Sequence, residues 1–425
     1  MDKFIIEGGR RLKGEVAISG SKNAALPILA STLLCDEACV IKGVPRLRDT
    51  NTMLAILHSL GKCIYFKDGQ AQVVPSSRGK FTVDYELLKT MRASFCVLGP
   101  LLAKIKKAHV SYPGGCVIGD RPVDLHIYGL KALGARIEID SGYIYAEANR
   151  LYGSYIFLGG AFGSSVLATA NVMMAATLAK GKTVIEAAAC EPEVADLAEF
   201  LIKMGAKIKG QGTHMIEIEG VKRLHGAEHK VIPDRIEAGT FMIGAMITKG
   251  DVTIKNVVCE HLGAVVDRLS KAGAHIEMGN GVLRVYFHGK LRPVNVTTLP
   301  YPGFPTDLQA QFVSLACFAF GVSVISEKVF PERFMHIPEL SRMGASIQRE
   351  GPYAIVDGGG ELSGAPVMAS DLRASAALVL AGLAAKGRTS VSRIYHLERG
   401  YERMDEKLRA MGATIWREKE KIAQE

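Results

Sequence analysis

The sequence predicts an α/β protein of two inside-out, barrel-like domains, each built from three repeated units with buried helices and outward-facing sheets. Three observations predict this fold class. A short sequence motif occurs six times, and a second set of recurring segments is apolar almost all round. The predicted strands between these segments alternate apolar and polar residues. Internal repeats of this kind determine the architecture of the whole chain, so they are considered first.

The repeated motif is Leu, two variable residues, an apolar residue, Gly, two further residues and Ile, as at residues 57–64. The two apolar positions three residues apart lie on one face of a helix. Glycine then ends the helix, because it accepts the left-handed conformation without a Cβ clash. The alternation that follows, as in Ile137-Glu138-Ile139, indicates a strand with one face in water. The six glycines stand at positions 61, 134, 205, 273, 344 and 412, with spacings of 68 to 73 residues.

A second apolar segment recurs in each unit and is predicted to be a helix buried on all sides. These segments have 10–14 residues, which is fewer than the roughly 20 that a membrane span needs. Buried helices surrounded by amphipathic helices and by strands with one solvent-exposed face differ from the arrangement in a doubly wound sheet. They favour helices packed inward beneath outward-facing sheets. The segments are 24–34, 93–103, 166–179, 238–247, 310–320 and 374–385.

Two groups of three units would each close one core, because a single core stops growing near about 250–300 residues. The break is expected in the stretch 224–230, which lacks apolar periodicity. The predicted first domain is therefore 22–230, and the second combines 1–21 with 231–425.

Composition narrows the classes of function. The net charge of +9, from 52 Lys and Arg against 43 Asp and Glu, favours an anionic partner. Because the basic residues are scattered and no nucleic-acid motif accompanies them, a small polyanionic substrate fits better than nucleic acid. The chain opens directly on a strand pattern without a signal sequence, and its eight cysteines lack a Cys-x-x-Cys pair, which favours reduced thiols in the cytoplasm. No cluster of His, Cys and carboxylates has metal-ligand spacing.

Cations stand at the expected starts of three buried helices, namely Lys22, Arg92 and Arg373. A helix N-terminus carries unpaired N–H groups and a partial positive charge, so it binds anions and disfavours cations. These three side chains are therefore interpreted as ligands of an anionic substrate. If all six buried helices point the same way, their N-termini line one cleft between the domains.

Other polar residues near the helix starts have two interpretations. Ser164, Ser165 and Asp234 are explained equally well as ordinary N-caps, and capping alone would explain Asp307. Arginine forks bind carboxylates and phosphates in a bidentate manner, which suits Arg333, whereas a surface salt bridge is the alternative.

The loop at 112–122 contains three Gly and two Pro, which predicts an exposed, hinged segment able to act as a lid. Cys116 lies within this loop, close in sequence to Arg121. A nearby cation stabilises a thiolate, so Cys116 is a candidate acid or nucleophile, with a spare surface thiol as the alternative.

Seven co-linear stretches resemble the UDP-N-acetylglucosamine 1-carboxyvinyltransferase family, the enolpyruvyl transferases that begin bacterial peptidoglycan synthesis. The likeness covers essentially the whole chain and implies two inside-out α/β domains joined by a double crossover near residues 21 and 230. The stretches are 19–24, 89–94, 113–126, 304–307, 333–336, 371–375 and 399–403.

By this resemblance the chain would move the enolpyruvyl group of phosphoenolpyruvate onto the 3′-hydroxyl of UDP-N-acetylglucosamine and release phosphate. The reaction would pass through a tetrahedral ketal without a metal or organic cofactor. Cys116 would be the acid, would be able to form a covalent adduct with phosphoenolpyruvate and would react with fosfomycin. Asp307 would accept the hydroxyl proton. Closure of the domains and the lid would exclude water.

The resemblance also implies which residues hold the substrates. Lys22, Arg121 and Arg399 would hold the phosphate, and Arg333 and Arg373 would favour the carboxylate. The implied catalytic residues are Cys116, Asp307, Lys22 and Arg399. The implied binding residues are Lys22, Asn23, Arg92, Arg121, Pro122, Val123, Asp124, Leu125, Ser164, Ser165, Val166, Asp307, Val329, Arg333, Asp371, Arg373 and Arg399.

The loop at 158–169 departs from the family pattern. Many relatives carry Lys or Pro where Gly163 stands and Gly where Leu167 stands, so nucleotide affinity is the property most open to change. Three other functions remain as alternatives: a less active paralogue or regulatory protein that binds a nucleotide sugar without turnover, the sister transferase acting on shikimate 3-phosphate, and a basic nucleic-acid binder. The oligomeric state does not follow from the sequence.

Overall fold

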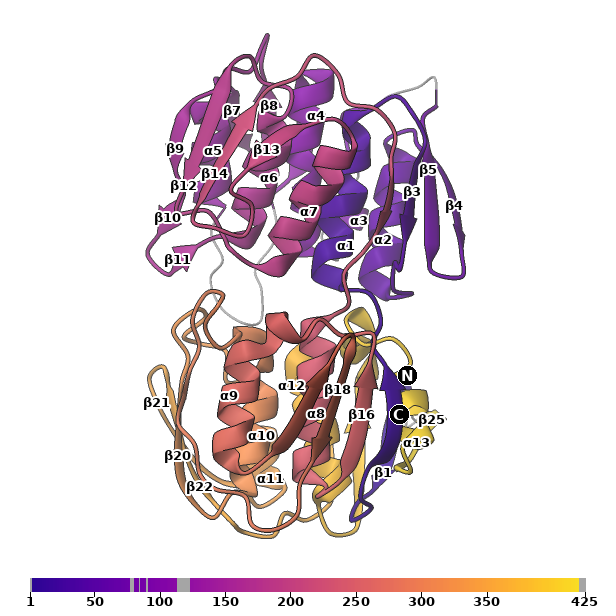
Figure 1. The fold of residues 1–425 in the computed structure, drawn as a ribbon, viewed down its shortest axis with the longest axis vertical. Helices are drawn as coiled ribbons and strands as arrows, with labels where there is room; N and C mark the ends of the chain where they lie inside the picture. The colour runs from indigo at the N-terminus through magenta and orange to yellow at the C-terminus, as the bar shows by residue number, and fades with distance from the viewer. Residues whose placement is uncertain (1, 77–79, 84, 89–90, 113–122, 420–425) are drawn as a thin grey trace. The chain divides into compact units, whose positions relative to one another are not determined.

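The structure is a computed structural model that describes residues 2–76, 80–83, 85–88, 91–112 and 123–419 (Figure 1). The described chain divides into two compact α/β units. The terminal unit holds the described residues up to Ser19 and from Pro233 onward, and the central unit holds those from Gly20 to Ile232. Each unit has its own apolar core, so each is described by itself.

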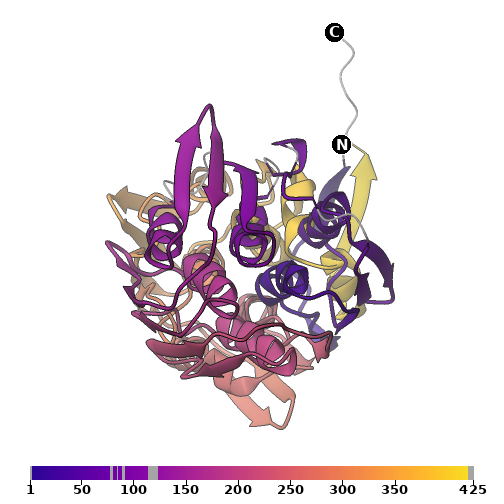
Figure 2. The same cartoon turned by 90° about the horizontal axis from the view of Figure 1, so that it is seen from above.

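The central unit has three sheets around a group of helices, and Figure 2 shows this unit end-on with strands at its rim. Its sheets run β15(Glu228–Lys230)-β3(Cys39–Lys42)-β5(Gln70–Val74)-β4(Cys63–Lys67), β6(Lys107–Ser111)-β8(Tyr143–Glu147)-β7(Arg136–Asp140) and β13(Lys207–Lys209)-β14(Met215–Glu219)-β12(Lys182–Glu186)-β9(Tyr155–Phe157), with a separate hairpin of β10(Gly159–Gly160) and β11(Gly163–Ser164). Its helices are α1(Lys22–Ser31), η1(Thr32–Leu34), α2(Arg48–Ser59), α3(Tyr85–Leu88), η2(Arg92–Val97), α4(Leu98–Ile105), α5(Asp124–Ala132), α6(Val166–Ala176) and α7(Pro192–Lys203).

The terminal unit repeats this plan with three four-stranded sheets. They run β23(Pro366–Met368)-β24(Arg388–Ser392)-β1(Asp2–Glu7)-β25(Thr414–Lys419), β17(His275–Gly279)-β18(Val282–Tyr286)-β16(Asp251–Lys255)-β2(Lys13–Ala17) and β19(Val296–Thr297)-β20(Gly321–Ser326)-β22(Tyr353–Gly358)-β21(Ser346–Glu350). The helices are α8(Arg235–Ile247), η3(Cys259–Leu262), α9(Gly263–Ala272), η4(Thr306–Leu308), α10(Gln309–Cys317), α11(Ile337–Arg342), α12(Leu372–Ala384), η5(Ile394–Arg399) and α13(Met404–Ala410).

The apolar segments form the buried helices that the sequence predicts. In α8 every residue from Ile236 to Ile247 is buried, and all nine residues of α10 are buried. Two segments predicted as single helices are instead divided: 24–34 into α1 and η1, and 93–103 into η2 and α4. Pro100 is the third residue of α4, in the first turn, where its missing N–H breaks no helical hydrogen bond.

The six repeated glycines end helices, as predicted. They follow α2, α5, α7, α9, α11 and α13, and each has a positive φ between 91° and 112°. An L-residue rarely adopts this left-handed conformation, so a side chain at any of these positions would strain the turn into the next strand. The repeat is therefore a repeat of one structural unit.

Candidate active site

The predicted site residues are divided between the two units. Cys116, Arg121 and Pro122 lie outside the described residues. The central unit holds Lys22, Asn23, Arg92, Val123, Asp124, Leu125, Ser164, Ser165 and Val166, and the terminal unit holds Asp307, Val329, Arg333, Asp371, Arg373 and Arg399.

In the terminal unit the Asp307 carboxylate lies between two arginines. Its Oδ1 is 2.8 Å from Nη1 of Arg333, and its Oδ2 is 2.8 Å from Nη2 of Arg373. The two arginine side chains are only 6% and 1% exposed, whereas Asp307 keeps 26%. The helix-capping interpretation of Asp307 is therefore wrong, because its side chain binds guanidinium groups. The surface interpretation of Arg333 is wrong as well, since this side chain is buried.

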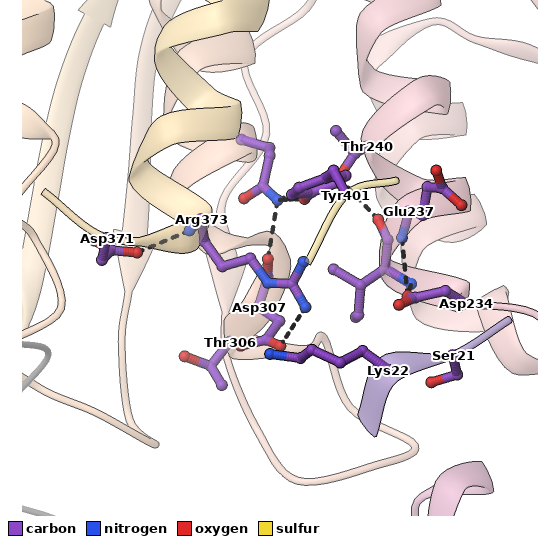
Figure 3. A network of polar contacts seen from close by, with 12 residues as sticks. Ser21, Lys22, Asp234, Glu237, Thr240, Thr306, Asp307, Asp371, Arg373 and Tyr401 are labelled. Carbon is purple, nitrogen blue, oxygen red and sulfur yellow. Dashed lines mark hydrogen bonds and ion pairs between the residues drawn. The ribbon is translucent and has the colours of Figure 1, made fainter. Parts of the chain in front are cut away.

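The start of α12 positions Arg373. Asp371 caps this helix by accepting hydrogen bonds from the backbone N–H groups of Arg373 at 2.8 Å and Ala374 at 3.1 Å. The Arg373 guanidinium lies 5.3 Å from the centre of the Tyr401 ring, which favours a cation over its face. Figure 3 shows Arg373 pointing from the end of this helix toward Asp307. The cation at the start of α12, Arg373, is thus paired with a carboxylate of the protein itself, Asp307.

Gln311 in α10 fixes the backbone behind Asp307. Its Nε2, which has two hydrogens to donate, lies 3.0 Å from the Asp307 carbonyl oxygen, 3.0 Å from the Tyr401 hydroxyl and 3.2 Å from Thr240 Oγ1. The Tyr401 and Thr240 hydroxyls are themselves 2.8 Å apart. Because all three side chains are buried, the contacts restrict the rotation of the turn that carries the carboxylate.

The site keeps Asp307 ionised and has spare positive charge. Burial alone would raise the pKa of Asp307, but the guanidinium groups of Arg373 and Arg333 outweigh it and hold the pKa well below its usual range. Among the described residues, Nε and Nη1 of Arg373 and Nε of Arg333 have no hydrogen-bond partner. Buried donors without partners cost free energy, so these N–H groups are suited to binding an anion.

In the central unit Lys22 begins α1 and pairs with a carboxylate. Its Nζ lies 3.2 Å from Oδ2 of Asp49 in the first turn of α2, and the side chains are 11% and 4% exposed. Ser21 caps α1, and its Oγ accepts a hydrogen bond from Ala24 N at 3.4 Å. Sequence reasoning missed Asp49, because a carboxylate in the first turn of a helix is ordinary.

A buried amide joins the segments that carry the other predicted binding residues. Asn171 of α6 donates from Nδ2 to the Phe95 carbonyl oxygen at 3.0 Å, and the same Nδ2 lies 2.9 Å from Nδ1 of His126 in α5. Its Oδ1 accepts from Gly99 N at 2.9 Å, and a Cβ at Gly99 would lie 2.3 Å from the Asn171 carbonyl oxygen. Residue 99 therefore has to be glycine for these helices to approach.

Ser164, Ser165 and Asp234 have local partners. Ser165 caps α6 by accepting from Ala168 N at 3.3 Å, while Ser164 lies in β11 opposite Gly159. Asp234 caps α8 through two backbone N–H groups at 2.8 and 3.0 Å. The N-cap interpretation is therefore confirmed for Ser165 and Asp234.

The structure adds two general observations. Among residues 2–76, 80–83, 85–88, 91–112 and 123–419, no group of three or more His, Cys, Asp and Glu side chains is arranged to hold a metal ion. No helix in these ranges combines the length and the apolar character needed to span a membrane.

Comparison with known proteins gives full-length matches. Residues 6–421 match the family described as EPSP synthase (3-phosphoshikimate 1-carboxyvinyltransferase). A UDP-N-acetylglucosamine 1-carboxyvinyltransferase of Methylacidiphilum infernorum is 55% identical over 99% of this chain and 100% of its own length. A protein of Carboxydothermus hydrogenoformans named UDP-N-acetylglucosamine 1-carboxyvinyltransferase 2 is 53% identical over 98% of this chain and 99% of its own.

Solved structures agree on the fold. The enolpyruvyl transferase NikO from Streptomyces tendae superimposes with a TM-score of 0.89 at 24% identity, covering 98% of each chain. An EPSP synthase from Acinetobacter baumannii gives a TM-score of 0.76 at 18% identity, covering 99% of this chain and 100% of its own. At these identities the likeness concerns the fold alone, and it confirms the predicted two-domain α/β class.

Proposed function

The chain belongs to the enolpyruvyl transferase family, among the UDP-N-acetylglucosamine 1-carboxyvinyltransferases, and from this premise we propose its reaction. The enzyme transfers the enolpyruvyl group of phosphoenolpyruvate to the 3′-hydroxyl of UDP-N-acetylglucosamine and releases phosphate. This reaction is the first committed step of peptidoglycan synthesis. The observation that carries the proposal is an ionised carboxylate, Asp307, held between two buried arginines that keep unpartnered N–H groups.

The chemistry assigns a role to each kind of group. The acceptor oxygen bonds to C2 of phosphoenolpyruvate, its proton passes to Asp307, and an acid protonates C3. Cys116 is that acid in this proposal and can also form a covalent adduct with phosphoenolpyruvate. Elimination from the tetrahedral ketal then breaks the bond between C2 and the phosphate oxygen and removes a proton from C3. This step restores the double bond and releases phosphate.

Arginine and lysine side chains suit the charges of phosphoenolpyruvate. The free N–H groups of Arg373 and Arg333 can bind the carboxylate in a bidentate manner, beside the carboxylate of Asp307. Lys22, Arg121 and Arg399 are assigned to the phosphate. The reaction needs no metal or organic cofactor, because phosphoenolpyruvate itself is the activated group donor. Both substrates are phosphorylated metabolites, so we place the reaction in the cytoplasm.

The nucleotide sugar is assigned to residues at the helix starts of the central unit and to one backbone segment of the terminal unit. The hairpin of β10 and β11 ends at the start of α6, and it carries the part of the sequence that departs from the family pattern. We therefore expect it to set nucleotide affinity. The assigned residues are Asn23, Arg92, Arg121, Pro122, Val123, Asp124, Leu125, Ser164, Ser165, Val166 and Val329.

Phosphate release tests the proposal. Purified protein is mixed with phosphoenolpyruvate and either UDP-N-acetylglucosamine or shikimate 3-phosphate, with single-substrate mixtures as controls. Release is expected only with UDP-N-acetylglucosamine, and Asp307→Asn should lower kcat by about 10²–10⁴-fold as a lost general base. Release from phosphoenolpyruvate with shikimate 3-phosphate, but not with UDP-N-acetylglucosamine, would identify the sister transferase. Calorimetric binding of UDP-N-acetylglucosamine without any release would identify a regulatory protein.

A further inference from the structure

A fully buried carboxylate, Glu327, lies next to the turn that carries Asp307. It follows the last residue of β20 and has no exposed surface. Among the described residues its partners are two hydroxyl groups and two backbone N–H groups. A buried charge without a cationic partner is costly unless hydrogen bonds replace its lost water. The four acceptor contacts of Glu327 take the place of that water.

The two carboxylate oxygens of Glu327 hold two different segments. Oε1 accepts from Thr298 Oγ1 at 2.6 Å and from the backbone N–H groups of Val329 and Phe330, each at 2.9 Å. Oε2 accepts from Thr306 Oγ1 at 2.9 Å. One side chain therefore fixes the backbone that carries Val329 and the residue that precedes Asp307.

Thr306 connects Glu327 to the arginine pair. Its Oγ1 accepts a hydrogen bond from Arg333 Nη1 at 3.1 Å, and the same Nη1 donates to Asp307 Oδ1 at 2.8 Å. A hydroxyl has one proton, and Thr306 donates it in the hydrogen bond to Glu327. The lone pairs of Thr306 Oγ1 therefore remain to accept from Arg333. The direction of each hydrogen bond from Glu327 to Asp307 is thereby determined.

Only a carboxylate satisfies both sides of this arrangement, because all its contacts require an acceptor. A glutamine of the same shape would have to turn its NH₂ group either toward Thr306 or toward the N–H groups of Val329 and Phe330. The first choice takes away the acceptor of the Thr306 proton and competes with Arg333. The second choice sets donors against donors along the backbone at Val329.

We propose that Glu327 is a positioning residue for the transfer reaction, which orients Arg333 through Thr306 and places the backbone of Val329. This inference rests on the proposed function, in which Arg333 and Asp307 act on the reacting groups and Val329 faces the sugar. Glu327 itself touches neither substrate. It determines the position from which Arg333 supports Asp307 and binds the carboxylate of phosphoenolpyruvate.

The test uses substitutions along the chain of contacts and one matched control. Glu327→Gln and Thr306→Val should each lower kcat/KM by about 10–100-fold, which corresponds to losing one well-placed charged hydrogen bond. Thr306→Ser keeps the hydroxyl and should retain nearly full activity. The double variant should be no worse than either single one. Ser314→Ala removes a buried hydrogen bond to Ala377 in the same unit that involves none of these residues, and should leave kcat unchanged.

Several results would overturn the inference. Wild-type kcat/KM in Glu327→Gln, or Thr306→Ser as impaired as Thr306→Val, would mean that the contacts only support folding. If Glu327→Gln does not fold, the two Thr306 variants still give the answer, because they retain Glu327. Crystal structures of the wild type and Thr306→Val measure the distance from Arg333 Nη1 to Asp307 Oδ1 without turnover. An unchanged distance would contradict the positioning role even if the wild type released no phosphate and the proposed function failed.

Discussion

Replacing Asp307 by asparagine should destabilise the terminal unit, apart from its effect on catalysis. The substitution keeps the shape of the side chain but removes the negative charge that two arginines share. The Arg373 side chain is 1% exposed and that of Arg333 6%, so neither guanidinium gains enough water to replace the lost partner. The folded protein would then hold two buried cations that lack their carboxylate.

The magnitude follows from the burial of the partners. Removing one member of a buried ion pair costs about 3–5 kcal/mol, because the other charge stays buried without compensation. The Asp307 side chain is itself 26% exposed, and water can reach it, which favours the lower end of this range. We expect the free energy of unfolding to fall by about 3 kcal/mol.

The single tryptophan makes this measurable. Trp416 lies in β25 of the terminal unit, with the Arg388 guanidinium 5.2 Å from its ring, so its fluorescence reports the unfolding of the unit that contains Asp307. With a urea m-value of about 2 kcal/mol per molar, a loss of about 3 kcal/mol moves the midpoint down by roughly 1.5 M. Fluorescence recorded across a urea series gives this midpoint directly.

Asp371→Asn provides the control, since it makes the same chemical change in the same unit. Asparagine caps helices as well as aspartate does, so the free energy of unfolding of this variant should change by less than about 0.5 kcal/mol. With the same m-value, its urea midpoint should shift by less than about 0.25 M. If Asp307→Asn shifted the midpoint no further than Asp371→Asn, the charge of Asp307 would contribute nothing to stability. The account of the arginine pair would then be wrong.

Three other substitutions have defined outcomes. Burial lowers the pKa of His336 to about 4, so the unfolded chain takes up a proton below about pH 6.5 that the folded protein binds only near pH 4. The free energy of unfolding should therefore fall by about 3 kcal/mol as the pH drops through this window. His336→Asn should remove this part of the loss, as measured by urea titrations at pH 7 and pH 4.5. Equal losses in the wild type and the variant would refute the role of His336. Gly99→Ala would raise helix propensity but should lower stability by about 1–3 kcal/mol, because its Cβ meets the Asn171 carbonyl; a raised melting temperature by circular dichroism would contradict the packing. Arg373→Lys cannot hold Asp307 and a second anion together, so KM for phosphoenolpyruvate should rise by about tenfold or more in the phosphate-release assay, and an unchanged KM would exclude this residue from the carboxylate site.

Local chemistry explains which parts of the fold the sequence could predict. A glycine after a helix and an apolar segment are decided by neighbouring residues, so the helix ends and buried helices were predictable. Asp307 was not, because its partners are 26 and 66 residues away and a helix start offered a simpler local explanation. Asp49 was missed for the same reason, being 27 residues from Lys22. Glu327 gave one signal, a single carboxylate directly after the β-branched run of β20.

The family resemblance named residues that the pattern alone left open. It brought Val329 into the predicted set, a residue that no local pattern marks. It did not reveal that Thr306 and Glu327 connect Arg333 with the backbone of Val329. These contacts depend on the three-dimensional arrangement of β20 and η4.

The strand β1 has a consequence for the way the chain is synthesised. It lies between β24 and β25, with Phe4 opposite Val391 and Ile5 opposite Trp416, so this strand is synthesised long before its two partners. Phe4 and Ile6 are fully buried in the finished protein and stay exposed to solvent during that interval. The central unit can fold first, because all its strands precede residue 233, and by folding it shortens the path between the two ends. A chain truncated before β25 would leave β1 without one of its neighbours, and such an open, apolar edge is prone to aggregate.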